Sequence, residues 1–244
     1  MAVPRSNNLP VIYAASDIHY PHYFDLFKKS LNNISDEPCL FLLAGDIIDK
    51  GKIEGAKPVF ESIFNKFPNS KIVATFGNDE WNELWDKLKE EYSNIDWIVD
   101  DYKVYSCNNI SISVIGTPGA LDKPTRWQIK NIPNIQEIYN NRLTKIRELL
   151  IKAKKISQKT ILLSHYALSK LTLKGENPYS YGELYSSKME KIIVETRPDV
   201  AIHGHAHRGT AYALLQNIPI YNVAIPLVKN ITKIIFIKNL EGFL

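Results

Sequence analysis

Several apolar runs of the sequence end in a side chain that can bind a metal ion. Runs of this kind, rich in β-branched residues, are typical of buried strands. Because the carboxyl ends of neighbouring strands in an α/β sheet meet at one edge, ligands gather there. We therefore expect one shared site. Its seven candidate side chains are Asp17 and His19 after residues 11–16, Asp46 after 40–45, Asn78 after 72–77, His165 after 161–164, and His205 and His207 after 200–204.

The chemistry of these side chains narrows the choice of metal. Carboxylates, imidazoles and an amide oxygen without a cysteine suit Mn²⁺, Fe or Zn²⁺ better than Ca²⁺ or a thiolate site. Seven ligands are too many for one ion, but they suit a pair of ions about 3.5–4 Å apart that share a carboxylate, the arrangement used for in-line attack on phosphorus. We predict two divalent cations per chain, Mn²⁺ first, with Fe, Zn²⁺ or Ni²⁺ as alternatives.

The elements that must position these ligands alternate between strands and helices. Strands are predicted at residues 11–15, 40–44, 72–76, 97–105, 110–115, 160–163, 200–202, 210–215, 218–223 and 233–237, and helices at 24–33, 56–66, 80–92, 134–156 and 183–196. A hairpin is expected to turn at residues 106–109, and no helix is expected after His203. Parallel units followed by an antiparallel tail indicate an α/β fold of two mixed sheets packed together with helices outside.

The clearest helical period begins after Pro133. Asn134 and Glu137 have the spacing of a capping box, which predicts the start of this helix. One buried stripe is expected at Tyr139, Leu143, Ile146, Leu150, Ala153 and Ile156.

Length, composition and charge are those of an ordinary globular chain. The 244 residues are 45 % apolar and are expected to form a single domain, residues 1–244. No apolar run approaches the roughly 18–20 residues of a membrane helix. The net charge of +4 comes from residues 142–159, where seven Lys and Arg accompany one Glu. One basic helix face does not favour nucleic acid as a partner. Two cysteines, Cys39 and Cys107, do not make a disulfide framework, and we expect a reducing cytoplasm.

The ordered motifs resemble those of the calcineurin-like metallophosphoesterases from residue 12 to about residue 225. The resemblance rests on Asp17-x-His19, Gly45-Asp46-x-x-Asp49, Gly77-Asn78-Asp79-Glu80, His165 and Gly204-His205-x-His207. It implies a four-layer αββα sandwich of two mixed β-sheets flanked by helices. It also implies two ligand sets that share Asp46: Asp17, His19, Asp46 and His207 for one metal, and Asp46, Asn78, His165 and His205 for the other. A hydroxide bridging the two metals would attack the phosphorus.

One position departs from the family's commonest pattern. Asp79 stands where many members have a histidine that protonates the leaving group. An Asp with a pKa near 3.9 is a poor acid at pH 7, although repulsion from a nearby Asp49 would raise one of the two pKa values. We count Asp79, Asp49 and Asn78 as candidate catalytic residues, and Glu80 as a carboxylate at a helix start. We expect a phosphodiesterase that acts on small or nucleotide-like phosphoesters.

Three other function classes stay open at this stage: a phosphomonoesterase, a nuclease of the same family, and a non-catalytic scaffold on the same fold. Candidate substrate contacts are His22, in the loop after the first strand, and Arg126 and Trp127, in the proline-rich segment 117–133. Arg126 would clamp a phosphate and Trp127 would stack on a base. His203 is interpreted as a core histidine. The pattern does not indicate an oligomeric state.

Overall fold

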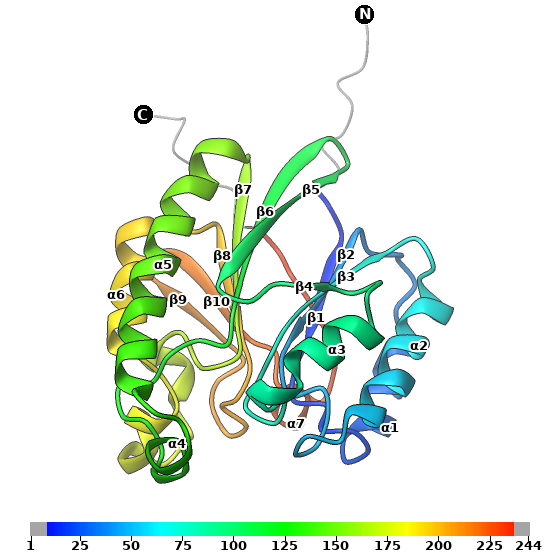
Figure 1. Cartoon of the computed structure of the whole chain (residues 1–244). Helices are drawn as coiled ribbons and strands as arrows, with labels where there is room; N and C mark the ends of the chain where they lie inside the picture. The colour runs from blue at the N-terminus through cyan, green and yellow to red at the C-terminus, as the bar shows by residue number, and fades with distance from the viewer. Residues whose placement is uncertain (1–8, 237–244) are drawn as a thin grey trace, which may run out of the picture.

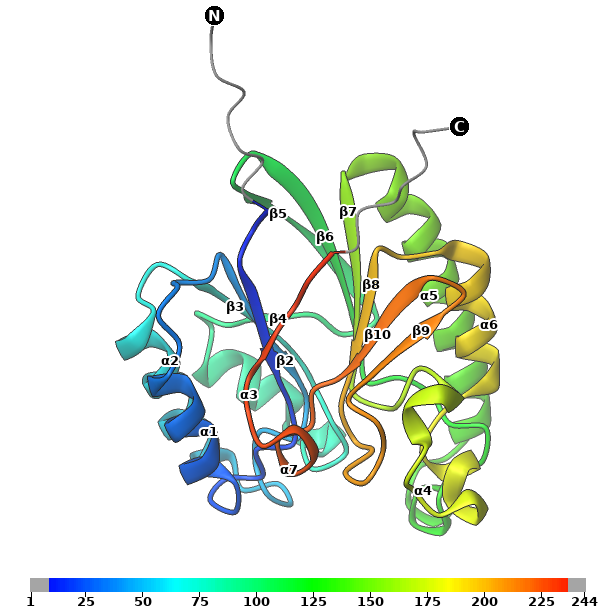
Figure 2. The same ribbon diagram turned by 180° about the vertical axis from the view of Figure 1, so that it is seen from behind.

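Two mixed sheets form the centre of the molecule (Figures 1 and 2). The computed structural model describes residues 9–236. The first sheet has the order β11–β1–β2–β3–β4, with β1 (Ile12–Ala15), β2 (Leu40–Ala44), β3 (Lys71–Thr75), β4 (Asp96–Trp97) and β11 (Thr232–Lys233). The second has the order β5–β6–β7–β8–β10–β9, with β5 (Asp101–Cys107), β6 (Ile110–Thr117), β7 (Lys159–Ser164), β8 (Val200–His203), β9 (Tyr212–Leu215) and β10 (Ile218–Asn222).

Burial on both faces explains why the central strands read as continuous apolar runs. Every residue of β1 and β2 is buried, as parallel strands covered on both sides must be. Pairing is parallel from β1 to β4 and from β6 through β7 and β8 to β10, and antiparallel at the edges, where β11, β5 and β9 pair. Aliphatic residues of both sheets, such as Leu42 and Ile161, pack together between them.

The helices lie on the two outer faces, which completes four layers (Figure 1). The first sheet packs against α1 (Phe24–Asn32), α2 (Ala56–Lys66) and α3 (Trp85–Glu91), and the second against α5 (Ile135–Ile156) and α6 (Ser187–Thr196). The predicted αββα sandwich is therefore confirmed. The short elements are α4 (Arg126–Asn131), α7 (Ile225–Val228), η1 (Ile53–Gly55), η2 (Asn82–Leu84), η3 (Lys170–Leu173) and η4 (Pro178–Glu183). Among the described residues, no helix is long and apolar enough to cross a membrane.

Helix α5 follows the predicted stripe but not the predicted cap. Five of the six stripe residues are buried, whereas Ile156 at the last turn is 47 % exposed. Asn134 adopts a left-handed conformation and its side chain caps nothing. A complete capping box instead begins α4, where Thr125 and Gln128 bond reciprocally. The segment 117–133 thus contains a helix that the proline content concealed.

Two other element predictions were wrong. The run 97–105 is not one strand, because β4 pairs with β3 in the first sheet and β5 pairs with β6 in the second. The chain passes between the sheets at residues 98–100, where Asp100 has a φ of 51°. A helix also follows His203, since α7 turns the chain from β10 back to β11 in the first sheet. Of the predicted strand 233–237, only Lys233 lies in a strand; residues 234–236 do not, and residue 237 lies outside the described residues.

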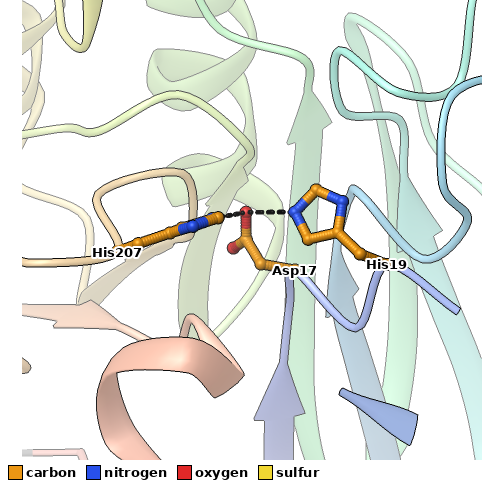
Figure 3. Close-up of side chains that lie close together, drawn as sticks. All are labelled: Asp17, His19 and His207. Carbon is orange, nitrogen blue, oxygen red and sulfur yellow. Dashed lines mark hydrogen bonds and ion pairs between the residues drawn. The ribbon is translucent and has the colours of Figure 1, made fainter. Parts of the chain in front are cut away.

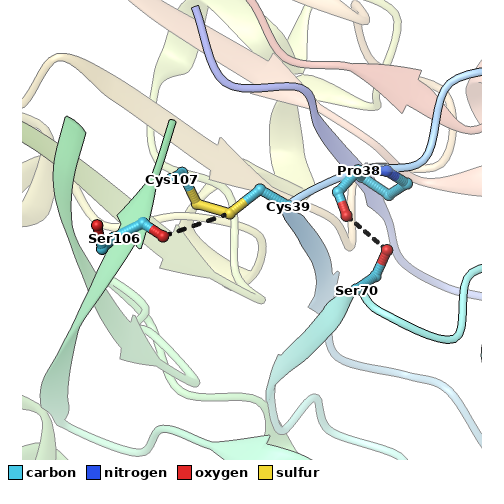
Figure 4. The surroundings of a disulfide bond; sticks show 5 residues. All are labelled: Pro38, Cys39, Ser70, Ser106 and Cys107. Atoms are coloured by element: carbon cyan, nitrogen blue, oxygen red, sulfur yellow. Dashed lines mark hydrogen bonds between the residues drawn. A yellow bond between two sulfur atoms is a disulfide. The ribbon is translucent and has the colours of Figure 1, made fainter. Parts of the chain in front are cut away.

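The two cysteines are joined, contrary to the expectation of free thiols (Figure 4). Cys39 lies directly before β2 and Cys107 ends β5, so the bond connects the two sheets. The expectation failed because the partners are 68 residues apart and meet only through the stacking of the sheets, with 5.9 Å between their Cα atoms. The expectation of a reducing cytoplasm was based on unpaired cysteines, so this disulfide removes the support for it.

Replacing both cysteines by serine is expected to lower the free energy of unfolding by about 3 kcal/mol, because the bond restricts a long loop in the unfolded chain. Urea unfolding with and without a reducing agent measures this effect. Reduction should lower the midpoint of the native protein and leave that of the double serine variant unchanged. An unchanged midpoint in the native protein would contradict a stabilising cross-link.

Candidate metal centre

Strands of both sheets end at one edge and bring the first group of ligands together (Figure 3). Asp17 and His19 follow β1, and His207 follows β8. Nε2 of His207 donates to Oδ1 of Asp17 at 2.8 Å, and Nε2 of His19 lies 3.7 Å from the same oxygen. Asp17 is fully buried. Burial works to raise its pKa, but the nearby imidazoles of His19 and His207 together outweigh that effect and hold the pKa well below its usual range.

A second group lies beside the first. Asp46, His165 and His205 have ligand atoms within 4.8 Å of one another. Nδ1 of His165 bonds to the carbonyl of Ala44, which can only accept, so Nδ1 carries the proton. Burial lowers the pKa of His165 and lowers that of His205 to about 3, so both rings stay neutral. Nε2 of His165 therefore directs a lone pair toward Oδ1 of Asn78, 3.0 Å away.

Asp46 stands between the two groups. Its Oδ2 lies 3.6 Å from Nε2 of His19 in the first group and 3.5 Å from Nε2 of His165 in the second. Its Oδ1 accepts from the backbone N–H of Asp79 at 2.8 Å, which fixes the carboxylate plane. Burial raises the pKa of Asp46 well above its usual value, so a positive charge nearby would stabilise its ionised form.

The donor atoms at this edge fit divalent cations. Nε2 of His19 is buried with no hydrogen-bond partner although it faces two carboxylates. Burial works to lower the pKa of His19, but Asp17, Asp79 and Asp46 together raise it to about 11. One cation could replace the proton on Nε2 of His19, and a second cation would separate the facing lone pairs of His165 and Asn78. The groups Asp17–His19–His207 and Asp46–His165–His205 each have the size of a metal site.

The backbone at this edge is unusual in a way that supports a functional site. Asp17, His19, Asp46 and His205 all have positive φ, between 41° and 66°. Residues other than glycine rarely adopt this conformation, and such strain clusters at functional sites. Gly77 is required for a different reason, because a Cβ there would lie 2.1 Å from Oδ1 of Asp46.

Comparison with known proteins agrees with this geometry. Residues 10–209 match the family model of the calcineurin-like phosphoesterases. The chain belongs to this family. Family membership supports metal-dependent hydrolysis of phosphoesters as the class of reaction. A comparison with curated proteins finds no match.

Several solved structures share the fold. Phosphopantetheinyl hydrolase from Mycobacterium tuberculosis has a TM-score of 0.70 and 12 % identity, over 93 % of this chain and 96 % of that one. A putative 5′-nucleotidase from Staphylococcus aureus has a TM-score of 0.59 and 16 % identity. The match covers 87 % of this chain and 48 % of that one, so this chain spans about half of its length. GAP50 of Plasmodium has a TM-score of 0.59 and 14 % identity, over 92 % of this chain and 75 % of that one. At these identities the likeness shows the fold.

Glu80 is a site residue that the sequence interpretation missed. It is 1 % exposed and precedes the helix in which it was predicted. Its two carboxylate oxygens accept four backbone N–H groups, from Asp46, Ile47, Ile48 and Gly77, at 2.7–3.1 Å. Burial raises the pKa of Glu80, and the four donors work against that rise. Glu80 thus joins the loop after β2 to the loop after β3.

Asp79, in the position where many family members have histidine, contacts a candidate ligand. Its Oδ2 accepts from Nδ1 of His19 at 3.1 Å. Burial works to raise the pKa of Asp79, but the hydrogen bond and charge of His19, together with the hydrogen bonds from the Lys50 N–H and the Asn78 amide, lower it. The hydrogen bond from Lys52 lowers the pKa of Asp49. The expectation that repulsion raises one of these two pKa values is therefore wrong, because each carboxylate has a cationic partner. His22 lies 3.6 Å from Asp49 on an otherwise exposed loop.

The other predicted residues differ in their surroundings: one is buried in the core, one lines a cleft beside the candidate ligands and one is exposed. His203 is fully buried, and its two ring nitrogens bond to Thr172 and to the carbonyl of Gly204, so the interpretation as a core histidine is confirmed. Trp127 lines a cleft that also contains Asn78 and His205. Arg126 is exposed and does not line that cleft.

Proposed function

We propose that this protein is a dinuclear metal-dependent phosphodiesterase that acts on small, nucleotide-like phosphoesters. The observation that carries the proposal is the position of Asp46. One of its oxygens is 3.5–3.6 Å from an imidazole nitrogen of each ligand group. A carboxylate shared between two ions is the arrangement that in-line displacement at phosphorus uses.

Each proposed ion has ligands from both sheets. Asp17, His19, Asp46 and His207 would hold one, and Asp46, Asn78, His165 and His205 the other. When bound, such a pair lowers the pKa of water toward neutrality and takes up charge on the phosphoryl oxygens. The residues of the chain fix the ligand geometry in advance. Asp79 orients His19, Ala44 orients His165, and Glu80 holds the loop of Asp46.

The identity of residue 79 supports a preference for diesters and activated esters. An alkyl phosphomonoester needs a proton on its leaving oxygen, and a general acid must hold that proton near the working pH. The pKa values of Asp79 and Asp49 are both lowered, which favours the form that cannot donate. Asp79 is better suited to orient His19 than to protonate a leaving group.

Hydrolysis of bis(p-nitrophenyl) phosphate and p-nitrophenyl phosphate, each with Mn²⁺, Ni²⁺ or Mg²⁺ and with or without a chelator, tests the proposal. We expect metal-dependent turnover with the diester preferred. GAP50, a structural neighbour, is described as an anchor, so a scaffold role is the alternative that this experiment separates. Protein that binds two ions but hydrolyses neither ester would overturn the proposal and favour a scaffold.

The contact between Asp79 and His19 leads to a prediction about metal binding. Asp79→Ala is expected to weaken Mn²⁺ binding about 10- to 100-fold, since partners of metal-ligating histidines have effects of this size. The backbone N–H of residue 79 still reaches Asp46. The variant removes the acceptor of His19 and also that of the Asn78 amide and of the Lys50 N–H. Asp79→Asn keeps an acceptor oxygen and should lose less. Calorimetric titration with Mn²⁺ measures the change, and native affinity in Asp79→Ala would show that the carboxylate does not orient the ring.

A further inference from the structure

A cleft extends from the candidate metal centre along the surface. One cavity of about 410 Å³ is lined by Asn78, Asp79 and His205. A second cavity, of about 440 Å³, lies farther from the histidines. The two are parts of one cleft because they share Asn78, Trp81, Trp127, Gln128 and Tyr166 in their linings. Two of these shared residues, Trp81 and Trp127, are 40 % and 57 % exposed.

Trp81 is held in place by the loop that follows β2. A Cβ on Gly51 would lie 2.8 Å from the indole ring, so the ring packs directly on the backbone there. Gly51 has a φ of +75° and donates its N–H to the carbonyl of Asp79. Trp81 follows Glu80, whose carboxylate is fixed by four backbone donors. An aromatic ring is thus placed on the first-sheet side of the cleft, two residues after Asp79.

Trp127 comes from the second-sheet side of the cleft, in α4 (Figure 1). The capping box between Thr125 and Gln128 begins this helix. The side-chain amide of Gln128 also donates to the hydroxyl of Tyr166 at 2.8 Å, and Tyr166 is adjacent to His165. The helix is therefore anchored beside the candidate ligands, although the indole of Trp127 covers little of the core.

The charges in the lining of the outer cavity do not favour a second phosphate there, because its two charged residues are Arg142 and Glu83. Arg142 is the only arginine in that lining, and its guanidinium already bonds to both carboxylate oxygens of Asp100 and to the carbonyl of Gly119. The remaining polar lining includes the amides of Asn82, Gln128 and Asn131. Amides both donate and accept, as the edge of a nucleobase requires.

We propose that this cleft binds the nucleobase of a nucleotide substrate, with Trp81 and Trp127 as its stacking walls; this inference rests on the proposed phosphodiesterase function. Two exposed indoles on opposite sides of a cleft that carries side-chain amides suit a planar heterocycle. The phosphoester of the same molecule would then lie at the metal-side cavity, beside Asn78 and His205. Base-bearing phosphoesters should bind more tightly than the same esters without a base.

The test uses two ligands that differ only in the base. One is the phosphonate analogue of AMP in which a CH₂ group replaces the ester oxygen, and the other is the matching phosphonate of ribose. Neither can be hydrolysed, so calorimetric titration of the Mn²⁺-loaded protein measures binding alone. We expect the adenosine compound to bind about tenfold more tightly or better, which is the size of effect that base stacking on aromatic side chains gives.

Single variants assign the preference to the two indoles. Trp127→Ala and Trp81→Ala should each lower the ratio of affinities to below about threefold, whereas Phe at either position should retain part of it. Affinity for the ribose phosphonate should not change. Tyr179→Ala is the matched control, because Tyr179 is 96 % exposed and lines neither cavity.

Two results would overturn the inference: equal affinities in the native protein, or an intact preference in both alanine variants. These results are distinguishable from failure of the proposed function. If the protein prefers the base-bearing ligand but hydrolyses no diester, the result supports the nucleobase cleft and contradicts the proposed phosphodiesterase function. If the protein hydrolyses the diester but shows no base preference, the result supports the phosphodiesterase function and contradicts the nucleobase cleft.

Discussion

Asp46→Asn is expected to lower kcat/KM for bis(p-nitrophenyl) phosphate by about 1,000-fold or more. Asparagine has nearly the same shape, but an amide carries no charge and offers only one oxygen to ions. The carboxylate of Asp46 reaches both ligand groups, so its loss weakens both. Metal ions supply several kcal/mol of charge stabilisation at phosphorus, and each 1.36 kcal/mol is a factor of ten in rate. Steady-state kinetics together with metal analysis measure the effect.

Asp86→Asn provides the control for this variant. It makes the same chemical change at a carboxylate whose side chain is fully exposed on α3, and it should leave both turnover and metal content unchanged. If Asp46→Asn kept two bound ions and more than a tenth of the native kcat/KM, Asp46 would not be the shared ligand.

Glu80→Gln is expected to destabilise the folded protein by about 4 kcal/mol. Four buried N–H groups currently point at two carboxylate oxygens. In glutamine, one oxygen becomes an NH₂ group, and two backbone donors then face another donor. Each buried donor left without an acceptor costs about 1–3 kcal/mol. Urea unfolding of chelator-treated protein measures the loss, so that metal binding does not contribute.

The same variant should also bind Mn²⁺ more weakly, because Glu80 holds the backbone N–H groups of Asp46 and Gly77. Glu90→Gln, on the exposed face of α3, makes the same change without buried donors and should be neutral. A loss of less than 1 kcal/mol in Glu80→Gln would mean that the four hydrogen bonds do not define the loop.

The candidate ligands could be predicted from the sequence because each one directly follows an apolar run or lies two residues after a ligand that does. The end of a strand is encoded locally, and parallel pairing then determines where the ends meet. Asp17, His165 and His207 are brought together on this basis. The same locality explains the success of the layer prediction, since burial on both faces leaves its mark on each strand separately.

The features that the sequence interpretation missed depend on contacts between distant segments. The acceptors of Glu80 lie on a loop more than 30 residues away, and a glutamate before a helix reads equally well as an ordinary first-turn charge. The pairing of Cys39 with Cys107 depends on how two sheets stack. The cap of α4 is different, because the spacing of Thr125 and Gln128 is a local signal that could have located that helix.

The division of the ligands between the sheets has a consequence for assembly. Asp17, His19, Asp46 and Asn78 belong to the first sheet, and His165, His205 and His207 to the second. Any ion held by both sets is an inter-sheet cross-link at one end of the sandwich, and the bond between Cys39 and Cys107 is another, covalent, between the same sheets. The two cross-links act at opposite ends of the strands, because Cys39 directly precedes β2 and Asp46 follows it. The disulfide thus holds the sheets together at the end away from the candidate ligands, and bound ions would hold them together at the ligand end.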